Sequence, residues 1–321
     1  MIRQPDMIAV EGVNGDHCII SPSQYSWGPF LAPRSTGLFD MPIQTNYGAY
    51  AFGQFFQSWK PKPRDVVWTM HIMNPETGQK IDQDSELWHV IYSRWRNMFA
   101  PDADATVVYT SQDGERRLGL RTLQAAQSVS TQNFEGGDPH LLAYGSIVQT
   151  MRAVLPFYVG TPDVYSWETP AAGSHWFTLP YFNPCTVDIW PEAEIDGGAT
   201  WVMPDYSFGN EAYGRGVNDL GKTVPIPELL PGENTTVMWR PDMEWLISEW
   251  ETSPWQRSPG LRHEYPIPPG KGSSATEGPD PGCVIRCLDA VSAGLGCILT
   301  LPRWYAEPFS TPRIVSSLGA A

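Results

Sequence analysis

Residues 64–124 change their hydrophobic pattern twice, and this stretch constrains the fold more than any other. Residues 66–72 are β-branched and aromatic and end in an Asn-Pro-Glu-Thr-Gly turn, which is typical of a strand. At 85–99 the apolar residues follow helical spacing instead. Residues 106–110 and 116–123 then flank Gln-Asp-Gly-Glu, where Asp-Gly favours a tight hairpin. The stretch therefore predicts a strand, one helix and a hairpin, in that order.

The predicted helix has an apolar stripe along one side. The stripe residues recur at spacings of three or four: Leu87, Ile91, Trp95 and Met98, with Trp88 and Phe99 beside them. Asp82 or Asp84 is placed to cap the N-terminus, and Pro101 ends the helix. His89 lies between apolar neighbours, and we expect it in a core or interface contact rather than as a metal ligand.

Length and composition favour two domains rich in β structure. A chain of 321 residues that is 41% hydrophobic can bury a large core, and this length usually means two domains. Its 31 prolines and 29 glycines imply many turns. We expect a mainly β protein whose first domain, at 1–160, carries one packed α-helix. A β-sandwich domain should follow at 161–308, and 309–321 should be a flexible tail or arm.

The rest of the first domain consists of short apolar pieces separated by turn residues. Residues 7–10 and 17–20 flank a Gly- and Asn-containing turn and predict a hairpin. Residues 47–56 are rich in aromatic residues and glycine, and we favour a core strand over an exposed interaction loop. Residues 59–63 read as a stiff extended connector. Apolar pieces at 141–144 and 151–159 should complete the sheet of this domain.

The second domain shows no helical stripe. Residues 161–176 are polar and aromatic and read as a linker. Short apolar pieces then alternate with Pro, Gly and Asp clusters, as in a sandwich of short strands. The predicted strands lie at 185–189, 199–203, 235–239, 245–250 and 297–301. Residues 206–222 and 268–282 should be surface loops.

Net charge and hydropathy exclude several classes of protein. The formal charge of −14 argues against a nucleic-acid-binding surface, which is built from clustered Lys and Arg. The first thirty residues lack the pattern of a signal peptide, and no run of 18 apolar residues predicts a membrane span. We therefore expect a soluble chain made in a cytoplasm.

The cysteines do not predict a disulfide framework or a metal site. Five cysteines are too few for such a framework at this length, and their number is odd: Cys18, Cys185, Cys283, Cys287 and Cys297. Cys283, Cys287 and Cys297 could ligate a metal, with His263 nearest in sequence as a fourth ligand, but their spacing is unusual for zinc. We expect reduced cysteines that pack as small hydrophobic residues.

No motif supports catalysis. Residues 216–223 match the GxxxxGK[ST] phosphate loop, but Pro225 and Pro227 follow at once, where that loop requires a helix. The histidines show no HxxxH, HExxH or HxH spacing, and no GxSxG elbow occurs. We therefore predict no catalytic, cofactor-binding or metal-binding residues, and no enzyme.

The 14 tryptophans leave one alternative open. Aromatic faces stack on sugar rings, so some tryptophans of the second domain could recognise cell-surface glycan. The candidates are Trp167, Trp176, Trp190 and Trp201. Most tryptophans in a β-rich chain lie in the core or in subunit interfaces, which is the reading we favour. The alternative function is thus a carbohydrate-binding module for attachment to the host.

Several segments, in order along most of the chain, resemble siphophage distal tail proteins (Dit-like proteins) and the related actinophage minor tail proteins. The strand, helix and hairpin of 64–123 are similar to one segment of that family. Asn-Pro-Cys-Thr-Val-Asp-Ile-Trp at 183–190, which continues to Gly-Gly at 197–198, resembles another, although a glycine-aspartate pair often stands at its start in the family. Leu-Leu-Pro-Gly-Glu at 229–233 resembles a turn, and Pro-Arg-Trp-Tyr at 302–305 resembles the closing strand.

The resemblance implies a structural part of a bacteriophage virion, located at the tail tip. Its first domain would be a β-barrel or split barrel with one packed helix and would form a ring, usually hexameric, and its second would be a galectin-like sandwich. The implied partners are other copies of the chain, the major tail tube protein, and the hub and tip proteins, with the tape measure protein and adhesion proteins as further candidates. The best candidates for contact surfaces are the aromatic residues Tyr47, Tyr50, Phe52 and Phe55 and the hairpin tip of Asp113, Gly114 and Glu115.

Overall fold

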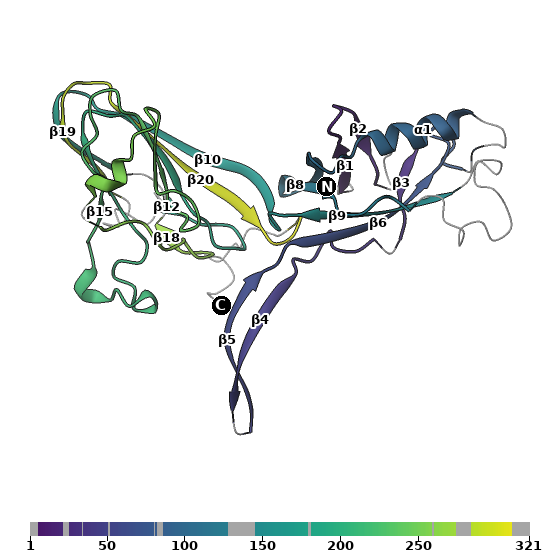
Figure 1. The fold of residues 1–321 in the computed structure, drawn as a ribbon, viewed down its shortest axis with the longest axis horizontal. Coiled ribbons are helices and arrows are strands. Elements are labelled where there is room, and N and C mark those ends of the chain that lie inside the picture. Colours follow the sequence, from purple (N-terminus) through teal and green to yellow (C-terminus); the bar gives the residue numbers. More distant parts are fainter. Residues whose placement is uncertain are drawn as a thin grey trace, which may run out of the picture. The chain divides into compact units, whose positions relative to one another are not determined.

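The protein divides into two compact units, and the chain passes from the first to the second after Gly160. The computed structural model describes residues 6–21, 26–33, 35–50, 52–79, 81, 86–127, 145–178, 181–258, 260–273 and 284–309. The capping residues Asp82 and Asp84, the piece at 141–144, Cys283, part of the 268–282 loop, the tail at 310–321 and the side chain of Tyr50 lie outside them. The described part is mainly β with one α-helix, which confirms the predicted fold class (Figure 1).

Unit 1 is built on antiparallel strands that come mostly from the first 160 residues. Its strands are β1 (Met7–Glu11), β2 (His17–Ile19), β3 (Pro29–Leu31), β4 (Ile43–Tyr50), β5 (Gly53–Pro61), β6 (Arg64–Ile72), β7 (Ala105–Ser111), β8 (Gly114–Thr122), β9 (Ser146–Ala153) and the start of β10 (Tyr158–Glu168). They pair in the orders β2-β1-β7-β8-β10 and β3-β6-β9-β8. The predicted hairpins β1–β2 and β7–β8 are confirmed.

The helix α1 (Glu86–Asn97) packs on this sheet much as predicted. Its buried stripe contains Trp88, Ile91 and Trp95, continued by Met98 after the helix. The ring of Trp95 lies 6.3 Å from that of Trp68 in β6. One expectation was wrong, because the stripe starts one residue later than predicted: Leu87 is exposed. His89 is exposed beside Trp88, so of the two roles expected for it only an interface contact remains.

The C-terminal end of the described chain returns to unit 1. Arg64, which is fully buried, donates hydrogen bonds to the carbonyl oxygens of Leu38 and Ala306 and lies over the ring of Tyr158. Arg116 donates to the carbonyl oxygen of Glu307, 2.9 Å away. These contacts hold residues 305–309 as part of unit 1, where the sequence predicted the second domain and the start of a tail.

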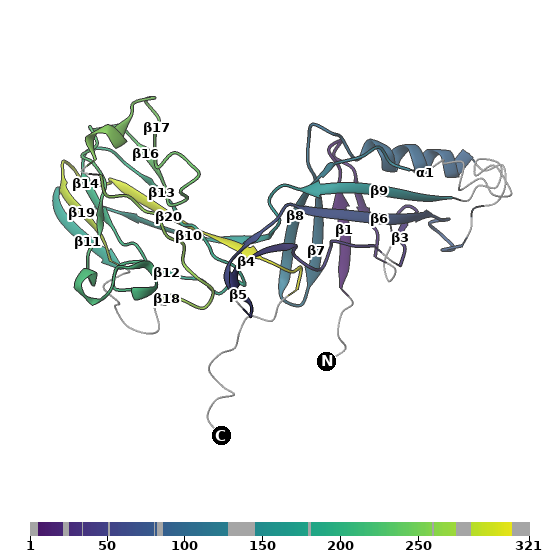
Figure 2. The same cartoon turned by 60° about the horizontal axis from the view of Figure 1, so that its bottom comes forward.

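Unit 2 contains two main antiparallel sheets (Figures 1 and 2). One has the order β17-β16-β13-β20-β10 and the other β11-β19-β14-β15, with a small β12–β18 pair. The bounds are β11 Gly173–Thr178, β12 Tyr181–Phe182, β13 Glu192–Ile195, β14 Thr200–Met203, β15 Val224–Pro225, β16 Thr235–Met238, β17 Leu246–Ser248, β18 Gly272–Ser273, β19 Val284–Ala290 and β20 Gly296–Tyr305. The ring of Trp167 in β10 stacks on Phe177 and meets Trp201, so side chains of the two sheets pack together.

Most of the strands predicted in the second half are present, with two corrections. Residues 161–176 are not a linker, because β10 and β11 occupy most of them. Residues 185–189 form no strand; only Ile189 makes an isolated bridge, to Ile267. The pieces predicted around 199–203, 235–239, 245–250 and 297–301 correspond to β14, β16, β17 and β20.

The phosphate-loop match at 216–223 takes a form unlike a phosphate loop. Val217–Asp219 forms one turn of 3-10 helix, η2, and no α-helix follows it. The amine of Lys222, which would reach a phosphate in such a loop, pairs with the carboxylate of Asp219. A second short 3-10 turn, η1 (Glu211–Tyr213), precedes it in the same long loop.

Candidate interaction surfaces

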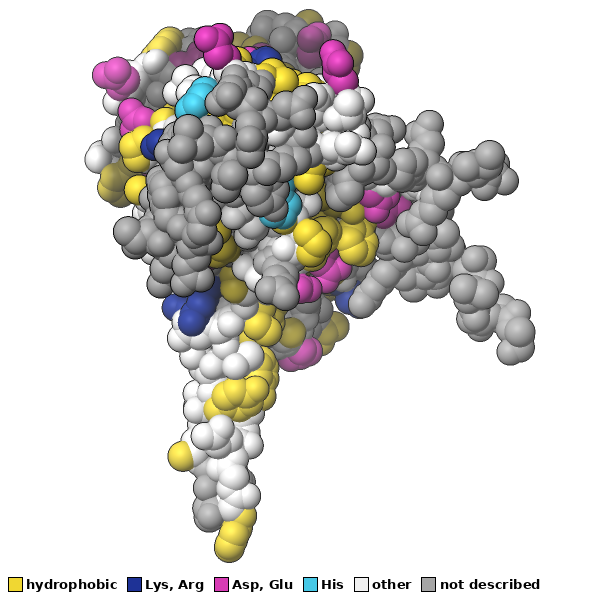
Figure 3. Space-filling model, turned by 90° about the vertical axis from the view of Figure 1, so that its right-hand side faces the viewer, with side chains coloured by type: hydrophobic (Ala, Val, Ile, Leu, Met, Phe, Trp, Pro, Cys, Tyr) yellow, Lys and Arg dark blue, Asp and Glu magenta, His cyan; other side chains and the backbone are white. Residues whose placement is uncertain are grey.

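The β4–β5 hairpin is the most unusual surface of the described protein. Its two strands pair with each other and with no other described strand. Figure 3 shows it standing clear of the rest of unit 1, with hydrophobic side chains along it. Phe52 at its tip is fully exposed, and five more large apolar side chains are about half-exposed: Ile43, Tyr47, Phe55, Phe56 and Trp59. An isolated two-stranded hairpin is marginally stable in water, so this one is suited to pairing with a partner.

Two expectations about this segment were wrong. The segment 47–56 does not form a core strand, because β4 and β5 expose large apolar side chains along the hairpin. Trp59–Pro61 do not form a connector, because they are the last residues of β5. Gly48 has an extended backbone, and the ring of Phe55 covers it so closely that a Cβ would come within 2.3 Å of that ring. Tyr47 and Phe56 face each other across the strands, with ring centroids 6.2 Å apart.

The hairpin differs in charge from the rest of the chain. Residues 43–59 contain no Asp, Glu, Lys or Arg, in a protein with 35 acidic and 21 basic residues. Exposed strands are usually protected from pairing by charged side chains, especially Lys. Sequence reasoning named the segment from Tyr47 to Phe56, with Tyr47, Tyr50, Phe52 and Phe55 as its candidates, but missed Ile43 and Trp59. The uncharged run was the signal that could have found them.

The second predicted surface, the tip of β7–β8, has ordinary features. Gly114 has a φ of 106°, which only glycine adopts readily, and the amide of Asp113 donates to the hydroxyl of Ser111. Glu115 forms an ion pair with Arg117, which also pairs with Glu11. The tip belongs to the main sheet of unit 1, whereas β4–β5 is a sheet of its own. The two predicted surfaces are thus separate features of the unit.

The four tryptophans proposed for sugar binding do not form one site. Trp201 is fully buried, and Trp167 packs against it and against Phe177. Trp176 in β11 is 74% exposed, and Trp190 is partly buried. Trp167 and Trp201 therefore belong to the packing between the two sheets, as expected of most tryptophans.

The cysteines of the described ranges are buried thiols that form no disulfide: Cys18, Cys185, Cys287 and Cys297. Burial raises the pKa of the Cys297 thiol to about 12, so it is protonated near neutral pH. His263 is buried against the ring of Trp239. Within the described ranges, no group of three His, Cys, Asp or Glu side chains could hold a metal ion, and no helix is long and apolar enough to span a bilayer.

Two segments with the family resemblance meet in unit 2. The amide of Gly198 donates to the carbonyl oxygen of Leu229, and Gly197 lies so close to the 229–233 turn that a Cβ there would come within 2.1 Å of the Leu230 oxygen. At the other end of the first segment, the buried side chain of Asn183 donates to the carbonyl oxygens of Val187 and Ile267. Glycine at 197 and asparagine at 183 are therefore required by local packing.

No protein-family model and no curated protein matches the sequence. Among solved structures, the Dit protein (gp 19.1) of phage SPP1 matches with a TM-score of 0.51 at 9% identity, over 93% of this chain and 98% of that one. That protein is described as a paradigm of the hub adsorption apparatus in phages that infect Gram-positive bacteria. The chain has the Dit fold. A chain of the phage P2 baseplate, in its activated conformation with calcium, matches with a TM-score of 0.44 at 7% identity, over 94% of this chain and 98% of that one.

The Dit fold accounts for the order of elements inferred from the sequence. The likeness to SPP1 Dit extends over both units, so the strand, helix and hairpin of unit 1 and the strands of unit 2 belong to one shared architecture. The recognition of a Dit-like chain from soft sequence motifs is confirmed at the level of the fold.

Proposed function

We propose that this protein is a structural component of a bacteriophage tail tip, in which copies of the chain close into a ring, hexameric as in the expectation from sequence. The observation that carries the proposal is the Dit fold, shared with SPP1 Dit over nearly the whole length of both chains. A Dit protein belongs to the hub of an adsorption apparatus, and the same architecture suits the same structural task. The protein would act through assembly and would catalyse no reaction.

The β4–β5 hairpin is the surface that we assign to contact between copies. A closed ring of identical subunits needs two different complementary surfaces on each subunit. The hairpin would supply one: its strands carry no charge from Ile43 to Trp59 and leave backbone groups available at both edges, and its half-exposed aromatic side chains would bury on a neighbour. The Asp113–Gly114 tip remains a separate candidate, for which the geometry offers no comparable support.

The ring would join the tail tube to the tip. Its proposed neighbours are the major tail tube protein and the hub and tip proteins, with the tape measure protein and adhesion proteins as further candidates. The resulting location is the tail tip of the virion, after synthesis in the host cytoplasm. Antibodies raised against the purified chain should label particles at one end of the tail; labelling elsewhere, or none, would exclude this location.

Substitutions in the hairpin test the proposed contact. In Phe52→Asp/Phe56→Asp, two exposed aromatic residues become charged, so the chain should fold normally and fail to assemble. Light scattering coupled to size exclusion measures the mass of the particle. Val154→Asp, at a 73% exposed apolar residue elsewhere in unit 1, is the control and should still assemble. If the hairpin variant assembles like wild type, the assigned contact is wrong.

A further inference from the structure

A pocket in unit 2 is lined by none of the residues assigned to assembly. It has a volume of about 280 Å³ and lies between the β16–β17 turn and the segment that follows the short 3-10 helix η3 (Pro254–Arg257). Its lining combines two indoles with polar and charged groups: Met243, Glu244, Trp245, Trp255, Ser258, Gly260 and Arg262. None of these residues is among the four tryptophans suggested by the sequence.

The indole of Trp245 is a fixed wall of this pocket. Its side chain is only 8% exposed, and its Nε1–H donates to Nδ1 of His263 at 3.2 Å. His263 stacks on Trp239, with ring centroids 3.9 Å apart. Burial lowers the pKa of His263 to about 3, so its ring stays neutral and Nδ1 remains an acceptor. Because Nε1–H of Trp245 is bound to His263, the ring lines the pocket with its carbon atoms.

The short 3-10 helix η3, which carries Trp255, is anchored through the side chain of Arg257. Arg257, two residues later in η3, donates to the carbonyl oxygen of Glu228 at 2.9 Å and to the buried carboxylate of Glu233 at 2.6 Å. The side chain of Trp255 itself is half-exposed. An exposed aromatic ring on an anchored turn loses little conformational freedom when a ligand binds, which favours affinity.

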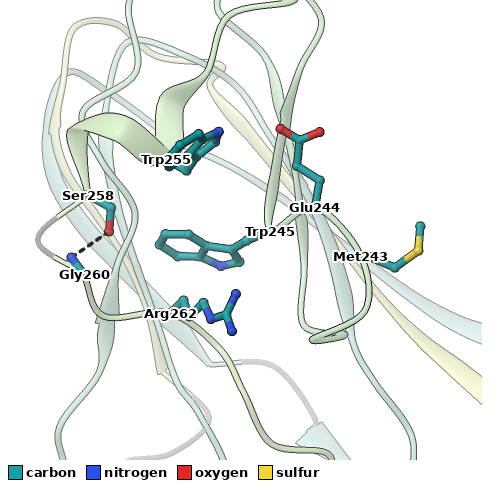
Figure 4. Close-up of a pocket in the computed structure, with 7 residues that line it drawn as sticks. All are labelled: Met243, Glu244, Trp245, Trp255, Ser258, Gly260 and Arg262. Carbon is teal, nitrogen blue, oxygen red and sulfur yellow. Dashed lines mark hydrogen bonds between the residues drawn. The ribbon is translucent and has the colours of Figure 1, made fainter.

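Polar groups surround the two indoles. In Figure 4 the indole of Trp255 is drawn above that of Trp245. The Glu244 carboxylate is at about the height of Trp255, and the Arg262 guanidinium is below Trp245. The hydroxyl of Ser258 accepts a hydrogen bond from the amide of Gly260, which leaves its proton to donate to a ligand. Arg262 uses Nε to bind Glu264, which leaves its two terminal nitrogens to donate. The pocket thus offers both donors and an acceptor.

From this lining we infer that the pocket binds a neutral saccharide ring. A pyranose has an apolar C–H face that stacks on indole and a rim of hydroxyls that both donate and accept. The volume is near the lower end of the range for small-molecule sites, which suits one sugar residue rather than a large cofactor. Arg262 disfavours a cationic guest, and Glu244 together with the net charge of −14 disfavours an anionic one.

Titration of the full-length chain with methyl glycosides of neutral hexoses and with N-acetylglucosamine tests this site. Tryptophan fluorescence and calorimetry should show saturable binding with a Kd on the order of 1 mM, as expected for a single small ligand. Choline and glucuronate, as cationic and anionic probes, should bind at least about tenfold more weakly. Saturable binding by wall polysaccharide from the host, at a lower apparent Kd, would identify the cell surface as the source of the ligand.

Matched variants locate the binding. Trp255→Ala should abolish it, Trp255→Phe should retain it within a few-fold, and Glu244→Gln and Arg262→Gln should each weaken it. Trp176→Ala, which removes the 74% exposed indole of β11, should leave it unchanged. The inference is overturned if no neutral sugar binds, if choline or glucuronate binds more tightly, or if binding survives in Trp255→Ala. Sugar binding does not require a ring, so this result is independent of the proposed assembly.

Discussion

Glu233 shows how one residue can hold together a segment that carries the family resemblance. Its side chain is 1% exposed, and its carboxylate accepts hydrogen bonds from the amide of Leu230, the hydroxyl of Thr252 and the guanidinium of Arg257. Burial alone would raise the pKa of this carboxyl, but these three donors outweigh it and lower the pKa from 4.5 to about 2. The ionised form is therefore a structural part of unit 2.

Replacing this carboxylate should destabilise unit 2. The lowered pKa corresponds to about 3 kcal/mol in favour of the folded state near neutral pH, and Glu233→Gln should lose most of it. Hydrogen exchange at the amides of β16 measures the change. Glu228→Gln, at an exposed position nearby, is the control and should have little effect. Equal protection in wild type and Glu233→Gln would show that the carboxylate is not needed.

The same group predicts a pH dependence. Because the pKa is lower in the folded state, the stabilisation is complete above about pH 4.5 and disappears as the pH falls towards 2. Wild type should therefore lose stability over this window by more than Glu233→Gln does. A turn at 229–233 was expected from the resemblance to Dit-like proteins. The partners of Glu233 could not be predicted, because Arg257 lies in a different segment of the chain.

At the scale of elements, the sequence predicted best where packing and local pattern agree. The α1 stripe and the β7–β8 turn were predictable, because helical spacing and an Asp-Gly turn act over a few residues. The β4–β5 hairpin was misread because a segment rich in aromatic residues indicates a strand but not which surface covers it. We propose that another molecule covers the hairpin, and the sequence of one chain does not show which surface that is.

The hairpin should therefore be dispensable for folding. Replacing residues 47–57 by Asn-Gly leaves Asn46 opposite Ser58, joined by a tight turn. Since the hairpin contributes no described residue to the main core of unit 1, the melting temperature should stay within a few degrees of wild type. The shortened chain should remain a monomer. A large loss of thermal stability would mean that the hairpin supports its own subunit instead.

At the scale of the whole molecule, the order of strand, helix and hairpin at 64–123 could be predicted, but the segments that make up each unit could not. Residues 305–309 belong to unit 1 because Arg64 and Arg116 bind their carbonyl oxygens, and neither arginine is marked by its sequence context. The pocket beside Trp255 was missed for the same reason. Its two indoles lie ten residues apart along the chain, on elements whose packing no local pattern reveals.

The central claim is that copies of this chain assemble into a closed ring, and direct imaging of the purified protein tests it best. Electron micrographs of the wild-type chain, recorded over a series of rising concentrations, should show rings of uniform diameter with hexameric symmetry in their class averages. Particles that remain single subunits at every concentration, or that extend into open filaments, would contradict the account.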